Sequence, residues 1–203
     1  MKKSFTILEL ILVVLILSIL YMAFVPKTNI NKLHELKEKL TLQIKHLRYK
    51  ALTDSKYSYE ENWQKQNWTI KFFRCKEEIG GFYYVIYSDE NRKGHPNQDE
   101  SLKDPLTNKY IYTSNSCKEN SENSKYTLLT KNFNIEKINI SCNNTSSLGQ
   151  LSFSYTGKVY SKLTTNINDQ EKYEIKDTCT LEFVDKKNQK FNINIESDTG
   201  FIY

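Results

Sequence analysis

The chain has 203 residues and a formal net charge of +5 at pH 7, and its basic and acidic residues are interleaved. It has one long apolar run at the N-terminus, and the polar remainder has the size of roughly one domain with a modest core. Strong nucleic-acid-binding proteins carry a concentrated basic stripe, which this sequence lacks. Most of the charge, as in the run from Lys32 to Lys39, is therefore interpreted as solvated surface.

The apolar run follows two lysines, Lys2 and Lys3, and extends from Phe5 to Val25. A helix of about 20 apolar residues crosses a bilayer, so residues 5–25 predict a transmembrane helix whose lysine-flanked end faces the cytoplasm. A secretory signal peptide is one alternative, but no small-x-small cleavage site follows the run. An ordinary single-span anchor is the other alternative.

Glu9 distinguishes a functional helix from a signal peptide or a simple anchor, because it places a carboxylate inside the apolar run. By insertion scales, such a group costs about 2.5 to 3.5 kcal/mol at the bilayer centre and less near the interface. Close to the end of the run, Glu9 could also extend its carboxylate toward the lipid headgroups. We interpret it as a functional residue.

The residues from Lys2 to Leu10 resemble the N-terminal signature of the type IV pilin and pseudopilin family. That signature is a short basic leader, a small residue, and then Phe-Thr-x-x-Glu-Leu at the start of the hydrophobic helix, and the sequence matches it in order and spacing. The resemblance implies that residues 1–4 are a leader peptide, and that prepilin peptidase cuts between Ser4 and Phe5 and N-methylates Phe5. Ser4 is a departure, because the family usually has glycine there.

The resemblance also implies a role for Glu9, the fifth residue of the mature chain. Its carboxylate would pair with the positive N-terminal amine of a neighbouring Phe5 as the subunit enters a filament. In a helix bundle of low dielectric, an unpaired carboxylate and an unpaired ammonium are each costly, and removing one partner strands the other. The pair would therefore set the axial register between subunits.

A minor pseudopilin, a structural subunit of a type II secretion-like pseudopilus, is the function that the resemblance implies. Its partners would be the other pilins of the filament, prepilin peptidase and the inner-membrane assembly platform. It would be a single-pass protein of the bacterial inner membrane with its C-terminal domain in the periplasm.

Two alternative functions remain open on the sequence. One is a minor pilin of a type IV pilus or DNA-uptake machine, with phosphate contacts from the lysines around Arg92-Lys93 and from Lys118 to Lys125; nucleic acid is the less favoured partner. The other is a lone anchored periplasmic domain that does not assemble.

Beyond the apolar run, Pro26 matches a proline that the family commonly has near this point, where it can kink the helix. A helix boundary at the membrane surface is the alternative interpretation. Residues 26–55 predict an amphipathic extension of the helix that ends between Thr53 and Lys56. Its apolar residues recur at spacings of three and four: Leu33, Leu36, Leu40, Ile44, Leu47 and Ala51. This stripe is expected to pack on a sheet, and the other face to meet neighbouring subunits.

Residues 56–203 predict one β-rich globular domain. Alternating apolar and aromatic residues bounded by turn residues predict strands at 68–73, 82–87, 110–113, 126–130, 135–142, 151–155, 179–184 and 191–195. The stretch 88–109 predicts a long loop, and 114–125 a mobile surface loop. The expected fold class is α+β, with a long N-terminal helix packed on an antiparallel β-sheet as in type IV pilin-like proteins.

The C-terminal part resembles the sheet of H-type and FimT-like minor pseudopilins. In those proteins, a strand-turn-Gly unit precedes a final hairpin that ends in Thr-Gly and an apolar residue. Thr156-Gly157 would belong to the first feature, and Thr199-Gly200-Phe201 to the second.

Four cysteines lie after the apolar run, where export would allow disulfides to persist: Cys75, Cys117, Cys142 and Cys179. They permit three connectivities, and the sequence alone does not choose among them. We favour Cys142 with Cys179 and Cys75 with Cys117, because each pair lies in or near segments expected to pair as strands or to clamp a loop. No C-x-x-C pair occurs, so no zinc site is expected.

Other chemistry finds little support in the sequence. Residues 89–94 follow the opening of a calcium loop, but Lys93 stands at the third ligand position and would repel a cation. His34, His46 and His95 form no i, i+4 metal pair, and no nucleophile elbow or phosphate loop occurs. The sequence therefore predicts no metal, no cofactor and no enzymatic activity.

Overall fold

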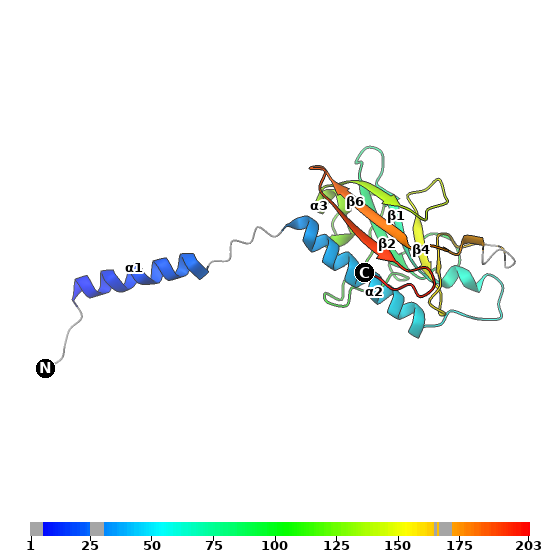
Figure 1. Ribbon diagram of the computed structural model, residues 1–203, viewed down its shortest axis with the longest axis horizontal. Coiled ribbons are helices and arrows are strands. Elements are labelled where there is room, and N and C mark those ends of the chain that lie inside the picture. The colour runs from blue at the N-terminus through cyan, green and yellow to red at the C-terminus, as the bar shows by residue number, and fades with distance from the viewer. Residues whose placement is uncertain (1–5, 25–30, 165, 167–171) are drawn as a thin grey trace. The chain divides into compact units, whose positions relative to one another are not determined.

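The computed structural model describes residues 6–24, 31–164, 166 and 172–203. Its contacts divide the chain into two compact units, Met1–Asn31 and Lys32–Tyr203 (Figure 1). The described residues of the first unit form one helix. Those of the second form a long helix, two β-sheets and several short helical turns.

The helix of the first unit is α1, Ile7–Phe24. Its only polar side chains apart from that of Tyr21 belong to Glu9 and Ser18, and the Ser18 hydroxyl donates to the carbonyl of Val14 at 2.7 Å. The hydroxyl is therefore satisfied within the helix. α1 lies inside the segment 5–25 that was expected to span a membrane; among the described residues, no helix combines the length and the apolarity that a membrane crossing requires.

The second unit begins with the helix α2, Lys32–Thr53. Its predicted apolar stripe is buried, with an exposed fraction of 8 % or less for every member. The helix ends at Thr53, as predicted. Of the helix expected over residues 26–55, Pro26 lies outside the described residues, and Asn31 is not helical.

The strands form two antiparallel sheets. The first has the order β2-β1-β4-β5, with the bounds Trp68–Arg74 (β1), Phe82–Tyr87 (β2), Gln150–Phe153 (β4) and Val159–Tyr160 (β5). The second has the order β3-β6-β7, with the bounds Ile135–Ile140 (β3), Cys179–Asp185 (β6) and Lys190–Ile195 (β7). The predicted α+β class with antiparallel pairing is confirmed, although the strands are divided between two sheets.

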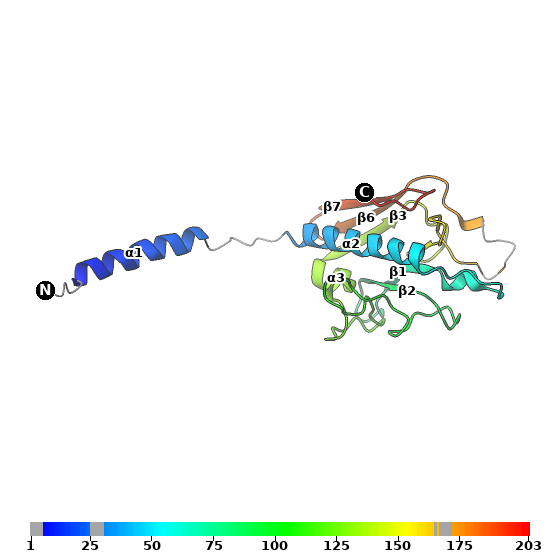
Figure 2. The same cartoon turned by 90° about the horizontal axis from the view of Figure 1, so that it is seen from below.

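α2 contacts both sheets, through β1 and β4 of the first and β7 of the second (Figure 2). The strands allow this because successive side chains point to opposite faces. In β6, every second residue from Cys179 to Asp185 is buried. The inner faces and the α2 stripe form one hydrophobic core, whose large, fully buried side chains include Phe72, Tyr84, Phe153 and Phe183.

The strand predicted at 126–130 is wrong. These residues belong to a 3₁₀-helix, η2 (Lys125–Thr127), and to the short helix α3 (Leu129–Phe133). A short apolar run fits either element, and tertiary contacts decide between them. Here the Thr130 hydroxyl accepts a hydrogen bond from the Phe82 N–H at 2.9 Å, which attaches the helical turn to the start of β2.

The segment between β2 and η2 is irregular, as predicted for 88–109, but two details differ. Residues 110–113 form isolated bridges at Tyr110 in place of a strand. Residues 114–125, expected to be a mobile surface loop, include Cys117, which is 5 % exposed. Its side chain belongs to a second hydrophobic cluster that contains apolar and aromatic side chains of β2.

Candidate functional site

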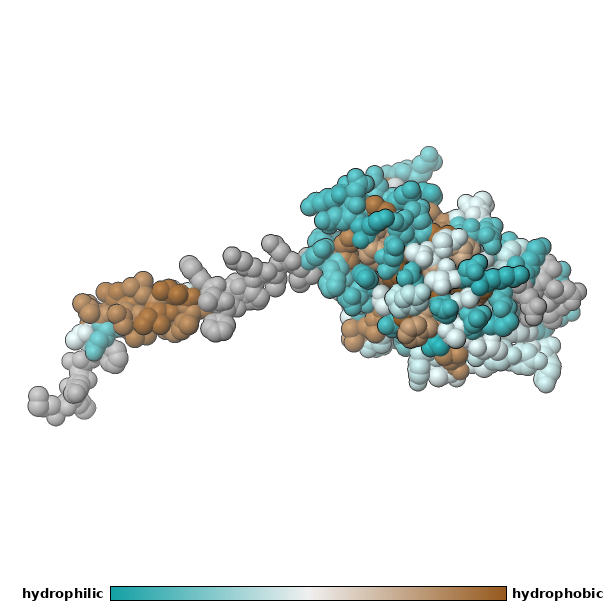
Figure 3. All heavy atoms as spheres, viewed as in Figure 1, coloured by the Kyte–Doolittle hydropathy of each residue, from teal (hydrophilic) through white to brown (hydrophobic). Residues whose placement is uncertain are grey.

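The first candidate surface for assembly is that of α1, which is apolar on all sides. Between Ile7 and Tyr21, each large apolar side chain leaves at least 42 % of its surface exposed. Figure 3 shows the helix as a continuous apolar surface on the face in view. A helix that is hydrophobic all round is normally buried in a protein core or a membrane. α1 therefore needs a cover that the described residues of its own unit do not supply.

Thr6 and Glu9 form a capping box at the start of α1. The Thr6 N–H and hydroxyl donate to Glu9 Oε2 at 2.8 and 3.0 Å, and the Glu9 N–H donates to Thr6 Oγ1 at 3.3 Å. This reciprocal pattern satisfies N–H groups that a helix leaves unpaired in its first turn. This capping box was not among the features predicted from the sequence, although the T-x-x-E spacing that signals it is present.

The capping box leaves the second oxygen of Glu9 accessible. Both hydrogen bonds that the carboxylate accepts go to Oε2, and no described residue donates to Oε1. A cation from another chain could therefore pair with Oε1 without breaking the cap. The other residues predicted to act at this end, Ser4 and Phe5, lie outside the described residues.

The face of α2 opposite its buried stripe carries exposed apolar side chains. Leu42, Tyr49 and Leu52 are 37, 60 and 39 % exposed. Their spacing of seven and three residues places them on one side of the helix, opposite the buried stripe. This is the face that was predicted to meet neighbouring subunits.

A buried polar network connects α2 to the loop after β2. The Lys39 ammonium lies 2.8 Å from Asp104 Oδ1, and Gln43 Nε2 donates to Asp104 Oδ2 at 2.6 Å. Gln43 Oε1 accepts in turn from the Tyr84 hydroxyl at 2.5 Å. The side chain of Lys39 is 8 % exposed and that of Asp104 0 %. Interpreting Lys39 as solvated surface was therefore wrong.

Asp104 also organises its own loop. Its Oδ1 accepts from the backbone N–H groups of Leu106 and Thr107, at 2.9 and 3.2 Å. Burial raises the pKa of Asp104, but the hydrogen bonds from Lys39 and Gln43 outweigh burial, so its pKa lies below the ordinary value. The sequence signals for this network are an Asp-Pro pair, which favours a turn, and a lysine and a glutamine four residues apart on one helix.

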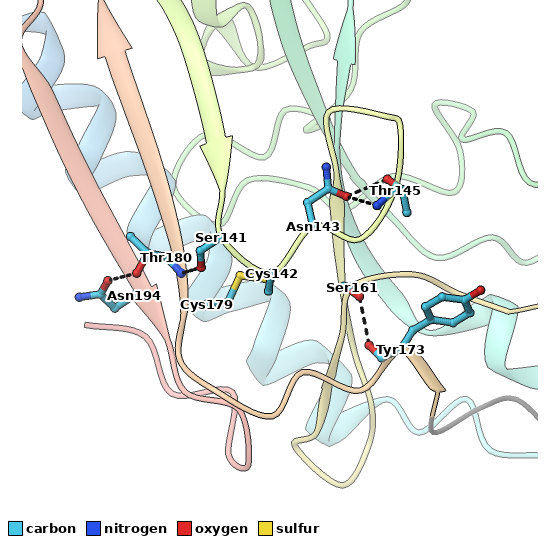
Figure 4. The surroundings of a disulfide bond; sticks show 9 residues. All are labelled: Ser141, Cys142, Asn143, Thr145, Ser161, Tyr173, Cys179, Thr180 and Asn194. Carbon is cyan, nitrogen blue, oxygen red and sulfur yellow. Dashed lines mark hydrogen bonds between the residues drawn. A yellow bond between two sulfur atoms is a disulfide. The ribbon is translucent and has the colours of Figure 1, made fainter.

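The predicted disulfide between Cys142 and Cys179 closes one end of the second sheet (Figure 4). The antiparallel register of β3 and β6, extended by two residues, brings the two cysteines opposite each other. Their Cα atoms are 5.3 Å apart, within the range that a disulfide requires. The adjacent residues Ser141 and Thr180 are also hydrogen-bonded. The Ser141 N–H donates to the Thr180 carbonyl at 3.0 Å, and the Thr180 N–H donates to the Ser141 hydroxyl at 2.9 Å.

The other predicted disulfide joins Cys75, just after β1, to Cys117 in the loop 114–125. Beside it, the Lys76 N–H donates to the Asn115 carbonyl at 2.8 Å. The disulfide thus attaches the loop to the end of β1, and this attachment explains why Cys117 is buried.

The candidate calcium loop is occupied by its own hydrogen bonds. The Asp89 carboxylate accepts from the N–H groups of Lys93 and Gly94, at 3.1 and 2.7 Å. Among the described residues, no group of three or more His, Cys, Asp or Glu side chains is placed to hold a metal ion. His46 is partly buried on α2, and this burial lowers its pKa.

The two Thr-Gly turns of the C-terminal part contact each other. Gly157 and Gly200 have φ of +90° and +63°, and a Cβ at Gly200 would lie 2.9 Å from the Gly157 carbonyl oxygen. Only glycine adopts this conformation at this distance without strain. Arg48 of α2 also donates to the carbonyl of Thr199 at 2.8 Å, so the helix holds the C-terminal turn in place.

Each of the two units thus has its own candidate surface for assembly. One is the exposed apolar helix α1 with Glu9 in its first turn, and the other is the exposed stripe of α2. In comparisons with known proteins, no family model, no curated protein and no solved structure matches the chain.

Proposed function

We propose that the chain is a structural subunit of a bacterial filament, a minor pseudopilin of a type II secretion-like pseudopilus. Residues 5–25 would hold it in the inner membrane, with the second unit in the periplasm. After removal of residues 1–4, the apolar helices of successive subunits would pack side by side. The observation that carries the proposal is the exposed apolar surface of α1 with a single carboxylate, Glu9, in its first turn.

Packing of like helices would give the surface of α1 the cover that it lacks. Removing apolar surface from water is favourable by roughly 25 cal/mol per Å². In such a bundle, a carboxylate and an amine are each costly alone, and pairing offsets both costs. Cleavage after Ser4 would create the amine of Phe5, so only the processed chain could form the pair with Glu9 of a neighbour.

The second unit is compatible with this role. Its two disulfides suit an oxidising compartment such as the periplasm. The exposed stripe of Leu42, Tyr49 and Leu52 on α2 would contact the neighbouring subunit. These contacts would add to the packing of α1.

Replacing Glu9 with glutamine is expected to block incorporation into filaments while leaving the chain in the membrane fraction. Glutamine can still accept the capping hydrogen bonds from Thr6, but it has no charge to pair with an amine. Incorporation is measured by immunoblotting the chain in sheared filaments and in membranes. The Glu9→Ala variant, which loses both the cap and the charge, is expected to fail as well.

A matched control for this prediction is Ser18→Ala in the same helix. The Ser18 hydroxyl bonds to the Val14 carbonyl within α1, so its loss should leave incorporation unchanged. If Glu9→Gln assembles like the wild type while Glu9→Ala does not, Glu9 acts only as a helix cap and the pairing mechanism is wrong.

The mature chain is expected to begin at an N-methylated Phe5. Mass spectrometry of the protein from cells with active prepilin peptidase should show the loss of residues 1–4, and cells lacking the peptidase should retain them. Ser4→Gly is expected to be cleaved at least as completely, because the peptidase of this family requires a small residue there. An intact Met1 terminus in the presence of the peptidase would refute the processing step.

A further inference from the structure

A recess on the outer face of the first sheet gathers basic side chains from separate segments of the chain. Its volume is about 300 Å³. We call this recess the lysine pocket, because four lysines line it. Lys65 comes from η1 (Trp63–Gln66) and Lys71 from β1. Lys93 comes from the loop after β2 and Lys162 from the segment after β5. The lining also includes Arg92 and one carboxylate, that of Asp89.

Little negative charge opposes the lysine pocket. Arg92 is paired with Glu60 at 2.5 Å, and Asp89 is the one carboxylate among the lining residues, against four lysines. Within the described part of the chain, none of the four lysines forms an ion pair with a carboxylate. Their positive charges therefore remain largely uncompensated where the recess brings them together.

Lys71 is a partly buried member of the pocket. It lies on β1 between Val85 of β2 and Gln150 of β4, and its ammonium is 5.1 Å from the centre of the Phe73 ring. Burial lowers the pKa of Lys71, and the charge of Asp89 opposes only part of this effect. An anion that enters the recess would stabilise this ammonium, because it would supply the partner that a buried charge requires.

A group of aromatic side chains borders the lysine pocket. Tyr57, Tyr59, Trp63 and Tyr155 are in contact, with ring centroids 5.1 to 6.1 Å apart. Tyr57, Tyr59 and Tyr155 are 49, 98 and 38 % exposed. Trp63 lines a second, smaller hollow that shares two lining residues with the lysine pocket, Lys162 among them. Trp63 and Lys162 line the same hollow, so Trp63 connects the aromatic group to the lysine pocket.

The second hollow also contains a buried acceptor that no described residue contacts with a donor. Gln64 is 4 % exposed, and its Nε2 donates to the Thr164 carbonyl at 3.2 Å. Its Oε1, in contrast, has no hydrogen-bond partner among the residues that the structure describes. Buried polar groups are nearly always hydrogen-bonded, so a small donor that enters the hollow would satisfy this oxygen.

We propose that the lysine pocket and the adjacent aromatic group form a binding site for single-stranded nucleic acid. The lysines contact backbone phosphates and the exposed rings stack with bases, which is the combination that proteins use to hold single strands. A duplex fits less well, because its bases are stacked on one another and cannot reach the rings. The proposal goes beyond the filament function, since all of its residues lie in the second unit and its test measures binding, not assembly.

Part of this surface was predicted from the sequence. Lys93 belongs to the Arg92-Lys93 segment that was expected to contact phosphates, but Arg92 is held by Glu60. Lys65, Lys71 and Lys162 were missed, because they are far apart in the sequence and only the fold brings them to one recess. The lack of a basic stripe in the sequence therefore did not exclude a basic site.

The test is fluorescence anisotropy of the full-length protein in detergent micelles with a labelled oligothymidylate of about 20 nucleotides, over a range of NaCl concentrations. Binding is expected to weaken with salt, with a logarithmic slope of about −0.7 for each phosphate contacted. The double variant Lys65→Gln/Lys162→Gln is expected to bind about tenfold or more weakly and with a shallower slope. Tyr59→Ala is expected to weaken binding without changing the slope, because stacking releases no counterion.

The matched control is Lys186→Gln/Lys187→Gln, which removes the same charge from the exposed turn after β6. It should bind within about twofold of the wild type. An equal loss in both double variants would attribute binding to net charge and overturn the proposal. It would also be overturned if the wild type fails to bind at low salt, or if a duplex or polygalacturonate competes as well as the oligothymidylate.

Discussion

Replacing Lys39 with methionine is expected to lower the free energy of unfolding by about 3 to 5 kcal/mol, because it leaves a buried carboxylate without its cation. Methionine keeps much of the length of the lysine side chain and packs well in an apolar site. The partners that remain to Asp104 are the amide of Gln43 and two backbone N–H groups. These are dipoles and cannot neutralise a charge. Urea unfolding followed by circular dichroism measures the loss.

Lys45→Met is the matched control for this prediction. Lys45 lies on the same helix but is exposed, so its replacement should change the free energy of unfolding by no more than about 0.5 kcal/mol. Adding Asp104→Asn to Lys39→Met is expected to recover part of the loss, because the amide has no charge and still accepts from the loop N–H groups. Equal losses in the Lys39 and Lys45 variants, or no recovery, would contradict the buried-charge explanation.

The pH dependence of the loss is a second check of the same prediction. Although burial raises the pKa of Asp104, the hydrogen bonds from Lys39 and Gln43 lower it, below the value of about 3.9 of an unfolded aspartate. The stability that this group contributes is fully present above the unfolded pKa and is lost as the pH falls through the folded pKa. Without Lys39 the pKa of Asp104 rises, so the difference between wild type and Lys39→Met should shrink as the pH falls from the folded pKa of the variant toward that of the wild type. A constant difference would argue against the charge.

Replacing both Cys142 and Cys179 with alanine is expected to lower the free energy of unfolding by about 4 kcal/mol. The two cysteines are 37 residues apart, and closing a loop of this length removes that much chain entropy from the unfolded state by the loop-closure model. For a folded unit of this size, the loss corresponds to a fall in Tm of roughly 8 to 16 °C. Thermal unfolding followed by circular dichroism checks the value.

The other disulfide provides the comparison for this second prediction. Cys75 and Cys117 are 42 residues apart, so replacing both with alanine should cost a similar free energy. Hydrogen exchange should differ: the first pair of replacements should expose amides at the facing ends of β3 and β6, and the second pair those of the loop 114–125. If the Tm of the Cys142→Ala/Cys179→Ala variant equals that of the wild type, this disulfide does not contribute to stability.

The sequence predicted the elements whose side chains repeat with a strong period. The buried positions of the α2 stripe were predicted, because a buried face imposes a period of 3.6 on a helix. The ends of the strands β1, β2, β6 and β7 were predicted to within two residues, because a buried face imposes a period of 2 on a strand. Both disulfides have the pairing that was favoured among the three connectivities, because the cysteines lie in or near segments expected to pair as strands or to clamp a loop. The T-x-x-E pattern of the capping box at Thr6 and Glu9 was equally readable from neighbouring residues.

What only the tertiary structure decided depends on residues that are far apart in the chain. Lys39 and Asp104 are separated by 65 positions, so no local pattern distinguishes this buried lysine from the solvated ones beside it. Contacts between residues distant in the sequence also decide three other features. These are the helical turn at 126–130, the division of the strands into two sheets, and the lysine pocket. A periodic pattern reports which side of an element is buried, but the partner on that side is chosen by packing of the whole unit.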